Sequence, residues 1–319
     1  TASHIVDVLD DEFSDVEMVC LHFYGGEPFC NVPAMRAMVE RALSKRENKF
    51  IFAVTTNGVS ATPEVIDLLN RGNFGVVVSI DGPAKIHDQC RKDAAGASTH
   101  ARVMEFIHDL REHTTCRIRG SAVVRSGWPL VRAVSYLKSL DVDTIKSQAV
   151  RTSGKTDYSL DDKEQEAYLA DLEMIGRQVI EDIKQDIQPC DDRFTSRVFQ
   201  LLKKEPRERF CGAGTTMFGI TPDAQVLPCI LMEKEGNSLG FVDDCTFREA
   251  GRRWVENRPI KKECADCDAL PLCGGGCPAM MSFCGDSECT IVRKNCDVAR
   301  MIYRHFEHEP EKLLVLAGV

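Results

Sequence analysis

Residues 16–150 alternate five short apolar runs with amphipathic stretches, and this alternation limits the fold more than any other feature. The runs are "VEMVCLHF", "FIFAVTT", "FGVVVSI", "RIRGSAVV" and "TIKSQAV", each of strand length. Helical periodicity fills the stretches between them, at residues 31–45, 62–71, 100–113 and 129–140. Strands that are separated by helices pair in parallel, so we expect an α/β fold with a doubly wound sheet or a partial barrel.

The two ends of the chain differ from this pattern. Residues 1–13 predict a helix that leads into the first visible strand, so the strand that should precede it is expected to be missing. Two further helices are predicted at about 162–186 and 191–203. Beyond residue 210 the chain is rich in Cys, Gly and Pro, and we expect metal binding rather than a hydrophobic core to hold it. The predicted domains are residues 1–187 and 188–319.

Composition and charge restrict the partners. The 319 residues are 43% hydrophobic and 28% charged, with a net charge of −9. No basic stripe is visible, and the longest apolar runs are strand-sized, which argues against nucleic-acid and membrane partners. No secretory leader opens the sequence, and ten of the 15 cysteines fall between Cys211 and Cys296. We therefore expect a reducing cytoplasm and metal ligation rather than an extracellular disulfide framework.

The segment "CADCDALPLCGGGC", residues 264–277, places four cysteines in fourteen positions. A lone CxxC could be a redox pair, but four thiols with short, unequal gaps are typical of ligands around a metal or an iron–sulfur cluster. Zinc is an alternative, because four-cysteine sites with such spacings also hold zinc. The glycines suit the sharp backbone turns that ligands on either side of a cluster require.

Polar residues follow three successive predicted strands. "YGGEPF" (24–29) follows the first, "TTNG" (55–58) ends the second and "VSIDGP" (78–83) the third, while Arg91 lies in the loop after the third. Glu27 could accept from a cationic ligand group, and Arg91 could pair with a ligand carboxylate. The simpler interpretations are a tight turn with an incidental Glu and a solvated surface Arg. Three such strand ends together favour one shared site.

These segments, together with the C-terminal cysteines, resemble a radical S-adenosylmethionine (SAM) enzyme with a SPASM domain. The branch modifies peptides and proteins and includes the anaerobic sulfatase-maturating enzymes. The resemblance implies a partial (β/α)6 barrel, here lacking its first strand, followed by a small Cys-rich SPASM domain that binds clusters. It covers nearly the whole chain.

The resemblance also implies the cluster ligands. The SPASM pattern falls on seven cysteines, which would divide between two auxiliary 4Fe–4S clusters: Cys264, Cys267, Cys273 and Cys296 for one, and Cys211, Cys229 and Cys277 for the other. The fourth ligand of the second cluster would be another cysteine such as Cys190, the substrate, or none. Ala224 occupies a position where the pattern has Gly. Cys284 and Cys289 are expected to be free, although either could be an extra ligand.

The same resemblance assigns a SAM pocket. Gly25, Gly26 and Glu27 would meet the methionine amino group, and Ser79 and Arg91 the polar portion of the cofactor. Thr55 and Asn57 would line the same pocket. The sequence does not identify catalytic residues.

Two features depart from the family pattern. The CxxxCxxC that binds the catalytic 4Fe–4S cluster does not occur in residues 1–319, and we expect it in a segment that precedes Thr1. In the sulfatase-maturating branch, an acid that serves as general base follows the second SPASM cysteine, whereas Ile230 follows Cys229 here. This difference does not favour formylglycine formation and leaves other peptide modifications open.

The expected function is radical SAM-dependent modification of a peptide or protein. The missing cluster would reduce SAM to a 5′-deoxyadenosyl radical, and the auxiliary clusters would bind substrate or pass electrons, with ferredoxin or flavodoxin as the electron donor. Two alternatives remain open at this point. One is an inactive, cluster-bearing relative that binds a peptide, and the other is a zinc protein with four-cysteine sites.

Overall fold

The computed structural model describes residues 2–46, 48–152, 154–233, 236–258, 260–284 and 286–317, with the side chains of 282–287 excepted. The strands are β1 (Val19–Phe23), β2 (Phe50–Thr56), β3 (Gly75–Ser79), β4 (Arg117–Val124), β5 (Thr144–Ala149), β6 (Gly219–Ile220) and β7 (Val226–Leu227). The helices up to residue 203 are α1 (Ala2–Glu12), α2 (Val32–Leu43), α3 (Pro63–Gly72), α4 (Ala84–Cys90), α5 (His100–His113), α6 (Leu130–Lys138), α7 (Asp162–Lys184) and α8 (Thr195–Lys203). After residue 245 come α9 (Phe247–Glu256), α10 (Leu270–Cys273), α11 (Pro278–Cys284) and α12 (Asp286–His305).

The main sheet has the strand order β1-β2-β3-β4-β5, and the pairs from β1 to β4 are parallel. This order confirms the α/β prediction, and a parallel sheet built from successive strands is consistent with a partial barrel. The five predicted strands and the helices α1, α2, α3, α5, α6, α7 and α8 occur where the sequence places them. Among the helices of the described residues, none combines the length and apolarity that a membrane span requires.

The chain forms two compact units. The first comprises Thr1–Ser121, Asp141–Asp143 and Gly212–Pro259, and the second Ala122–Leu140, Thr144–Cys211 and Ile260–Val319. Each unit therefore takes segments from both sides of residue 188. The division into domains 1–187 and 188–319 stays a prediction.

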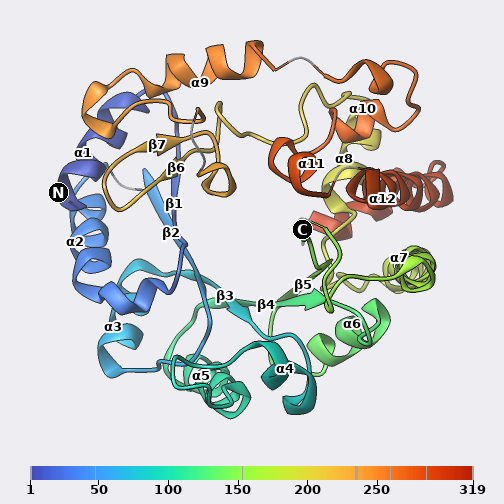
Figure 1. The fold of residues 1–319 in the computed structure, drawn as a ribbon, viewed down its shortest axis with the longest axis horizontal. Coiled ribbons are helices and arrows are strands. Elements are labelled where there is room, and N and C mark those ends of the chain that lie inside the picture. Colours follow the sequence, from blue (N-terminus) through green and yellow to red (C-terminus); the bar gives the residue numbers. More distant parts are fainter. Residues whose placement is uncertain are drawn as a thin grey trace. The chain divides into compact units, whose positions relative to one another are not determined.

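In the first unit, α2, α3 and α5 lie outside the strands β1 to β3 (Figure 1). The local sequence explains where two of these helices begin. Asn31 caps α2 by accepting from the Ala34 N–H, and Thr62 caps α3 in the same way through Val65. The helices bury Val39, Leu68 and Phe106 in the core that the strands share. The strands β1 to β3 are thus packed against these helices.

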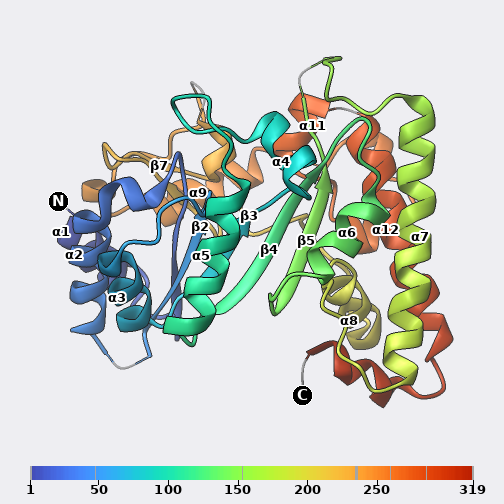
Figure 2. The same ribbon diagram turned by 90° about the horizontal axis from the view of Figure 1, so that it is seen from below.

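In the second unit, α12 packs against α7 and α8, an arrangement that Figure 2 also shows. Gly176, in the middle of α7, permits the close approach, because a Cβ there would lie 2.2 Å from Cγ1 of Val298. Val298 and Ile302 of α12, and Phe306 directly after this helix, are buried. The expectation that little besides metal binding holds the chain beyond residue 210 is therefore wrong for this segment, since α12 contributes an apolar face to a helical core.

Candidate cofactor and cluster sites

The three segments predicted to bind SAM lie at the carboxyl ends of β1, β2 and β3, which are neighbours in the sheet. Loops at this edge of a parallel sheet are the usual place for a ligand site. All seven predicted cofactor residues belong to the first unit. They are Gly25, Gly26, Glu27, Thr55, Asn57, Ser79 and Arg91.

The two glycines after β1 leave open space beside the backbone. Gly25 has a φ of +138°, which side chains disfavour, and a Cβ built on Gly25 or Gly26 would meet no atom within 4 Å. A ligand can therefore approach the bare main chain at this position.

The Glu27 carboxylate connects the end of β1 to the end of β2. Its Oε1 accepts from the Thr56 hydroxyl at 2.8 Å and from the Phe29 N–H at 3.2 Å, and its Oε2 accepts from the Asn57 N–H at 2.7 Å. An ionised carboxylate can accept about four hydrogen bonds, so one position on Oε2 is left for a cationic group. The role of Thr56 in fixing this carboxylate was not predicted from the sequence.

Thr55 and Asn57 flank Thr56 and point to different partners. The Thr55 hydroxyl lies 2.9 Å from Nε2 of His22 on the neighbouring strand. The Asn57 side chain accepts from the Val59 N–H at 3.0 Å and so shapes the turn after β2. His22 was not predicted as a site residue. The sequence does place it near the end of the first predicted strand, two residues before Tyr24.

Arg91 pairs with Asp81 rather than standing in solvent. It lies in a loop, as predicted, and this loop follows the short helix α4 rather than β3 itself. Its Nε and Nη2 donate to the two carboxylate oxygens of Asp81, at 2.7 and 3.1 Å. The Asp81 side chain is 7% exposed and that of Arg91 29%. Asp81 thus binds one edge of the guanidinium, the edge with Nε and Nη2, and the remaining N–H groups can donate to a second anion.

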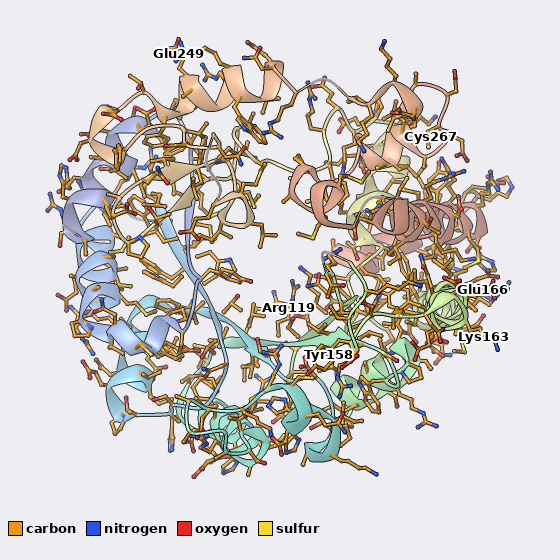
Figure 3. All side chains as sticks on the ribbon, viewed as in Figure 1. Arg119, Tyr158, Lys163, Glu166, Glu249 and Cys267 are labelled. Carbon is orange, nitrogen blue, oxygen red and sulfur yellow. The ribbon has the colours of Figure 1, made fainter. Side chains whose placement is uncertain are left out.

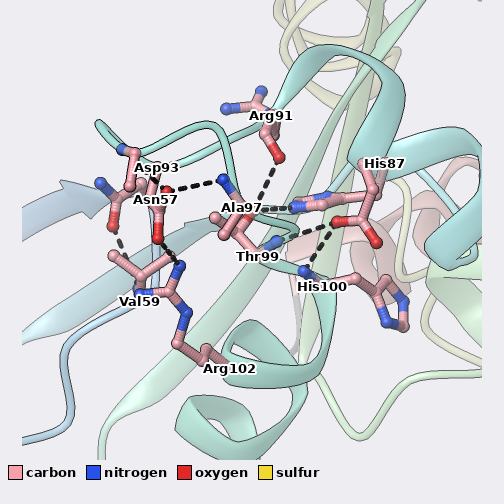
Figure 4. A network of polar contacts seen from close by, with 11 residues as sticks. Asn57, Val59, His87, Arg91, Asp93, Ala97, Thr99, His100 and Arg102 are labelled. Carbon is pink, nitrogen blue, oxygen red and sulfur yellow. Dashed lines mark hydrogen bonds and ion pairs between the residues drawn. The ribbon is translucent and has the colours of Figure 1, made fainter.

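A buried histidine lies next to this pair, and Figure 4 shows its contact with Thr99. His87 is fully buried, its Nδ1 accepts from the Asp81 N–H at 3.3 Å, and its Nε2 lies 2.9 Å from the Thr99 hydroxyl. That hydroxyl donates to the Arg91 carbonyl, so the network assigns the proton of a neutral ring to Nε2. Burial lowers the pKa of His87 to about 4. The segment from Asp81 to Thr99 is therefore tied together around a neutral imidazole.

The cysteine segment of the second unit contains three consecutive left-handed residues. Gly274, Gly275 and Gly276 have φ values of +69°, +90° and +82°. Gly274 ends α10, and a Cβ there would lie 2.3 Å from the carbonyl carbon of Arg209. Only glycine suits this path, as expected for a sharp turn between Cys273 and Cys277. Figure 3 marks Cys267 in the same segment, close to α10.

Four cysteines are among the residues that line one cavity of about 30 Å³ in this unit: Cys264, Cys267, Cys273 and Cys289. Cys296 is fully buried in the adjoining cluster with Ala269, Leu272 and Val292, against which Cys267 and Cys273 pack. In the part of the chain that the structure describes, no three His, Cys, Asp or Glu side chains are arranged to hold a single metal ion.

Backbone N–H groups surround two of the thiols. Those of Gly275 and Gly276 hydrogen-bond to the thiol of Cys273, and those of Ala279 and Met280 to the thiol of Cys277. Burial raises the pKa of both thiols, and these hydrogen bonds oppose it. Thiols with amide donors around a cavity are the chemistry that cluster ligation requires, so the donor set fits an iron–sulfur cluster.

The other predicted ligand set is divided between the units. Cys211 and Cys277 belong to the second unit, where burial, and to a smaller extent the negative charge of Cys211, raise the pKa of the Cys277 thiol. Cys229 belongs to the first unit and precedes a short 3₁₀ helix, Ile230–Met232. Ala224, in the turn before β7, has a φ of +67°, a left-handed conformation that glycine adopts more readily than alanine.

None of the fourteen cysteines that the structure describes forms a disulfide. Cys289, expected to be free, lines the same cavity as three predicted ligands. The side chain of Cys284 lies outside the described residues.

Comparisons with known proteins identify a domain in residues 3–121. Residues 3–121 match the model of the Radical SAM superfamily. The cysteine-type anaerobic sulfatase-maturating enzyme of Clostridium perfringens is 26% identical over 274 residues, which cover 80% of this chain and 72% of that enzyme. The serine-type enzyme of Klebsiella aerogenes is 23% identical over 255 residues, 74% of this chain and 60% of that enzyme.

Solved structures share the fold. A histidine-tagged form of anSMEcpe with bound AdoMet matches with a TM-score of 0.80 at 19% identity, over 98% of this chain and 88% of that one. Streptococcus suis SuiB bound to precursor peptide SuiA matches with a TM-score of 0.56 at 16% identity, over 90% and 67%. Residues 3–121 thus carry a radical SAM domain, and the chain is homologous to anaerobic sulfatase-maturating enzymes, which confirms the resemblance seen in the sequence.

Proposed function

We propose that this chain carries out SAM-dependent radical modification of a peptide or protein. One observation carries the proposal: an acceptor and a cation lie beyond the carboxyl ends of β1 and β3, the two strands that flank β2 in the sheet of the radical SAM domain. Glu27 keeps one acceptor position open, and Arg91 keeps N–H donors beyond those that bind Asp81. The methionine part of SAM presents an ammonium and a carboxylate, which are complementary to this pair.

The residues of the pocket would act as a positioning frame. Gly25 and Gly26 let the ligand approach the main chain, Glu27 accepts from the ammonium group, and Arg91 pairs with the carboxylate. Ser79, Thr55 and Asn57 border the same edge of the sheet. When bound and reductively cleaved, SAM supplies a 5′-deoxyadenosyl radical that takes a hydrogen atom from the substrate.

The C-terminal cysteines would hold two auxiliary 4Fe–4S clusters. Cys264, Cys267, Cys273 and Cys296 form the first ligand set, supported by the shared cavity and core cluster. Cys211, Cys229 and Cys277 form the second. These clusters would bind substrate or pass electrons from a donor such as ferredoxin or flavodoxin, in the cytoplasm.

A peptide substrate is supported by the relatives. The solved structure of native anSMEcpe contains AdoMet together with the Cp18Cys peptide, and that of SuiB contains its precursor peptide. Because Ile230 follows Cys229 where the sulfatase-maturating branch has an acid, we propose a peptide modification other than formylglycine formation.

SAM binding tests the pocket. Equilibrium dialysis with radiolabelled SAM should show saturable binding to the anaerobically reconstituted protein, and Arg91→Gln should weaken it about tenfold or more, the loss of roughly one charge-assisted contact. Arg102→Gln is the matched control, because Arg102 pairs with Asp93 at 2.6 Å in the same segment. Equal binding by the Arg91 variant would contradict the pocket.

Metal analysis tests the cluster assignment. Iron and sulfide for two 4Fe–4S clusters, with a brown colour that bleaches on reduction, are the expected result. Zinc with negligible iron after anaerobic reconstitution would identify a zinc protein instead. Iron for one cluster would mean that the set of Cys211, Cys229 and Cys277 is not a working site.

A further inference from the structure

Arg197, on α8, has an unused hydrogen-bond donor inside the second unit. Its Nε is buried and has no hydrogen-bond partner among the residues that the structure describes. Buried donors are almost always paired in folded proteins, so an exception indicates a missing acceptor. The helix α8 packs against both α10 and α12, which carry Cys273 and Cys296.

Two of the predicted ligands lie close to this guanidinium. Burial raises the pKa of the Cys273 and Cys296 thiols, and the positive charge of Arg197 opposes this rise; the Arg197 side chain also donates a hydrogen bond to the Cys296 thiol. Cys296 is fully buried, so this interaction is not screened by solvent. Arg197 is therefore next to the ligand set without belonging to it.

A second arginine is held beside the first. Arg207 donates from Nη1 to the Phe210 carbonyl at 3.1 Å and from Nη2 to the Ser196 hydroxyl at 2.7 Å. Burial and the neighbouring charge of Arg197 lower the pKa of Arg207, whereas Cys296, Cys273 and Cys211 raise it. Two like charges brought together in a half-buried place favour an anion between or beside them.

We propose that Arg197 is a positioning residue that donates a hydrogen bond to the cluster held by Cys264, Cys267, Cys273 and Cys296 and raises its reduction potential. The inference rests on the proposed function, because it requires a cluster at these cysteines. A 4Fe–4S cluster with four thiolates is anionic and gains a further negative charge on one-electron reduction. A buried cation with an N–H donor stabilises the reduced form more than the oxidised form, which makes reduction easier.

The substitution Arg197→Gln removes the charge and the Nε donor. We expect it to make one-electron reduction of this cluster about tenfold less favourable, a lowering of the potential by about 59 mV. Lys203→Gln is the matched control, because Lys203 is an exposed cation on the same helix and should leave the potential unchanged.

The experiment is a dithionite titration of the anaerobically reconstituted full chain, followed by electron paramagnetic resonance. The signal that Cys264→Ser removes identifies the relevant cluster. Arg197→Lys keeps the charge without Nε and should give an intermediate potential. If Arg197→Gln does not assemble a cluster, Arg197→Lys still tests the proposal. A cluster potential in Arg197→Lys equal to that of wild type would then overturn it.

The possible failures are distinguishable. Full iron content with the same potential in wild type and Arg197→Gln overturns the role of Arg197 and leaves the cluster assignment intact. Absence of iron from wild type and variants alike overturns both. An equal shift in Lys203→Gln would assign the effect to general charge and contradict a specific contact.

Discussion

Arg91 and Asp81, ten positions apart, form a two-pronged ion pair at the end of β3, with Nε···Oδ2 and Nη2···Oδ1 distances of 2.7 and 3.1 Å. Bidentate pairs of this kind fix the plane of the guanidinium as well as its position. Because Asp81 is almost fully buried, the pair also anchors Arg91 to the sheet. The arginine that would bind the SAM carboxylate is thus oriented before the ligand arrives.

Asp81→Asn should weaken SAM binding through Arg91. The amide keeps the size of the side chain but loses the charge and one acceptor, so the guanidinium is held less firmly. We expect SAM binding to weaken about tenfold, or about 1.4 kcal/mol. Asp93→Asn, which disturbs the pair with Arg102, should leave binding unchanged in the same dialysis measurement. Equal losses in both variants would contradict a specific role for Asp81.

The stability of the protein should fall on acidification through His87. Its pKa is about 4 when folded, against an ordinary value of 6.5, because burial disfavours the charged ring. Between these values the unfolded chain takes up a proton that the folded chain does not, so stability present above pH 6.5 is lost as the pH falls to about 4. The loss approaches about 3 kcal/mol. Urea unfolding at several pH values should show a smaller loss in His87→Gln, and an identical pH dependence would contradict the assignment.

Ala224→Gly should stabilise the first unit. Ala224 holds a φ of +67°, which costs an L-residue about 1–2 kcal/mol, while glycine loses more backbone entropy on folding. The net gain expected in urea unfolding is about 1 kcal/mol. Ala250→Gly, in the interior of α9, should have the opposite sign and cost about 1 kcal/mol. A loss of stability in Ala224→Gly would mean that the turn does not need this conformation.

Cys273→Ser should remove iron without unfolding the second unit. The thiol lines the cavity, but α12 is held to α7 by buried side chains that do not depend on a cluster. We expect lower iron content with unchanged protease resistance of residues 286–305. Cys245→Ser, at an exposed cysteine outside the pattern, should keep full iron. Full iron in Cys273→Ser would refute the ligand assignment, and proteolysis of α12 would show that metal binding does hold this segment.

The sequence predicted the parallel strands well because each is a compact apolar run. β2, predicted as residues 50–56, is Phe50–Thr56 in the structure. The long helix α12 was not predicted, since its buried face at Val292, Cys296, Ala299 and Ile302 includes a cysteine and an alanine. The spacing of that face is helical, but the cysteine pattern of the region obscured it.

The sequence predicted which residues form the candidate site, but it did not predict the contacts between them. Polar groups after three neighbouring strands indicated one site, and they do lie at one edge of the sheet. The ion pair of Arg91 with Asp81 depends on the path of α4, a seven-residue helix without a side-chain cap. An ion pair between residues ten positions apart has no characteristic spacing in the sequence. The contact of Arg197 with Cys296 has none either.

Release of 5′-deoxyadenosine tests the central claim most directly. The 319 residues contain no CxxxCxxC, so we expect the chain alone not to cleave SAM when dithionite is added. The same chain joined to an upstream segment with CxxxCxxC should release 5′-deoxyadenosine, and Arg91→Gln should reduce that release while Arg102→Gln does not. Release by the 319-residue chain alone, or none from the extended chain with all clusters reconstituted, would contradict the account.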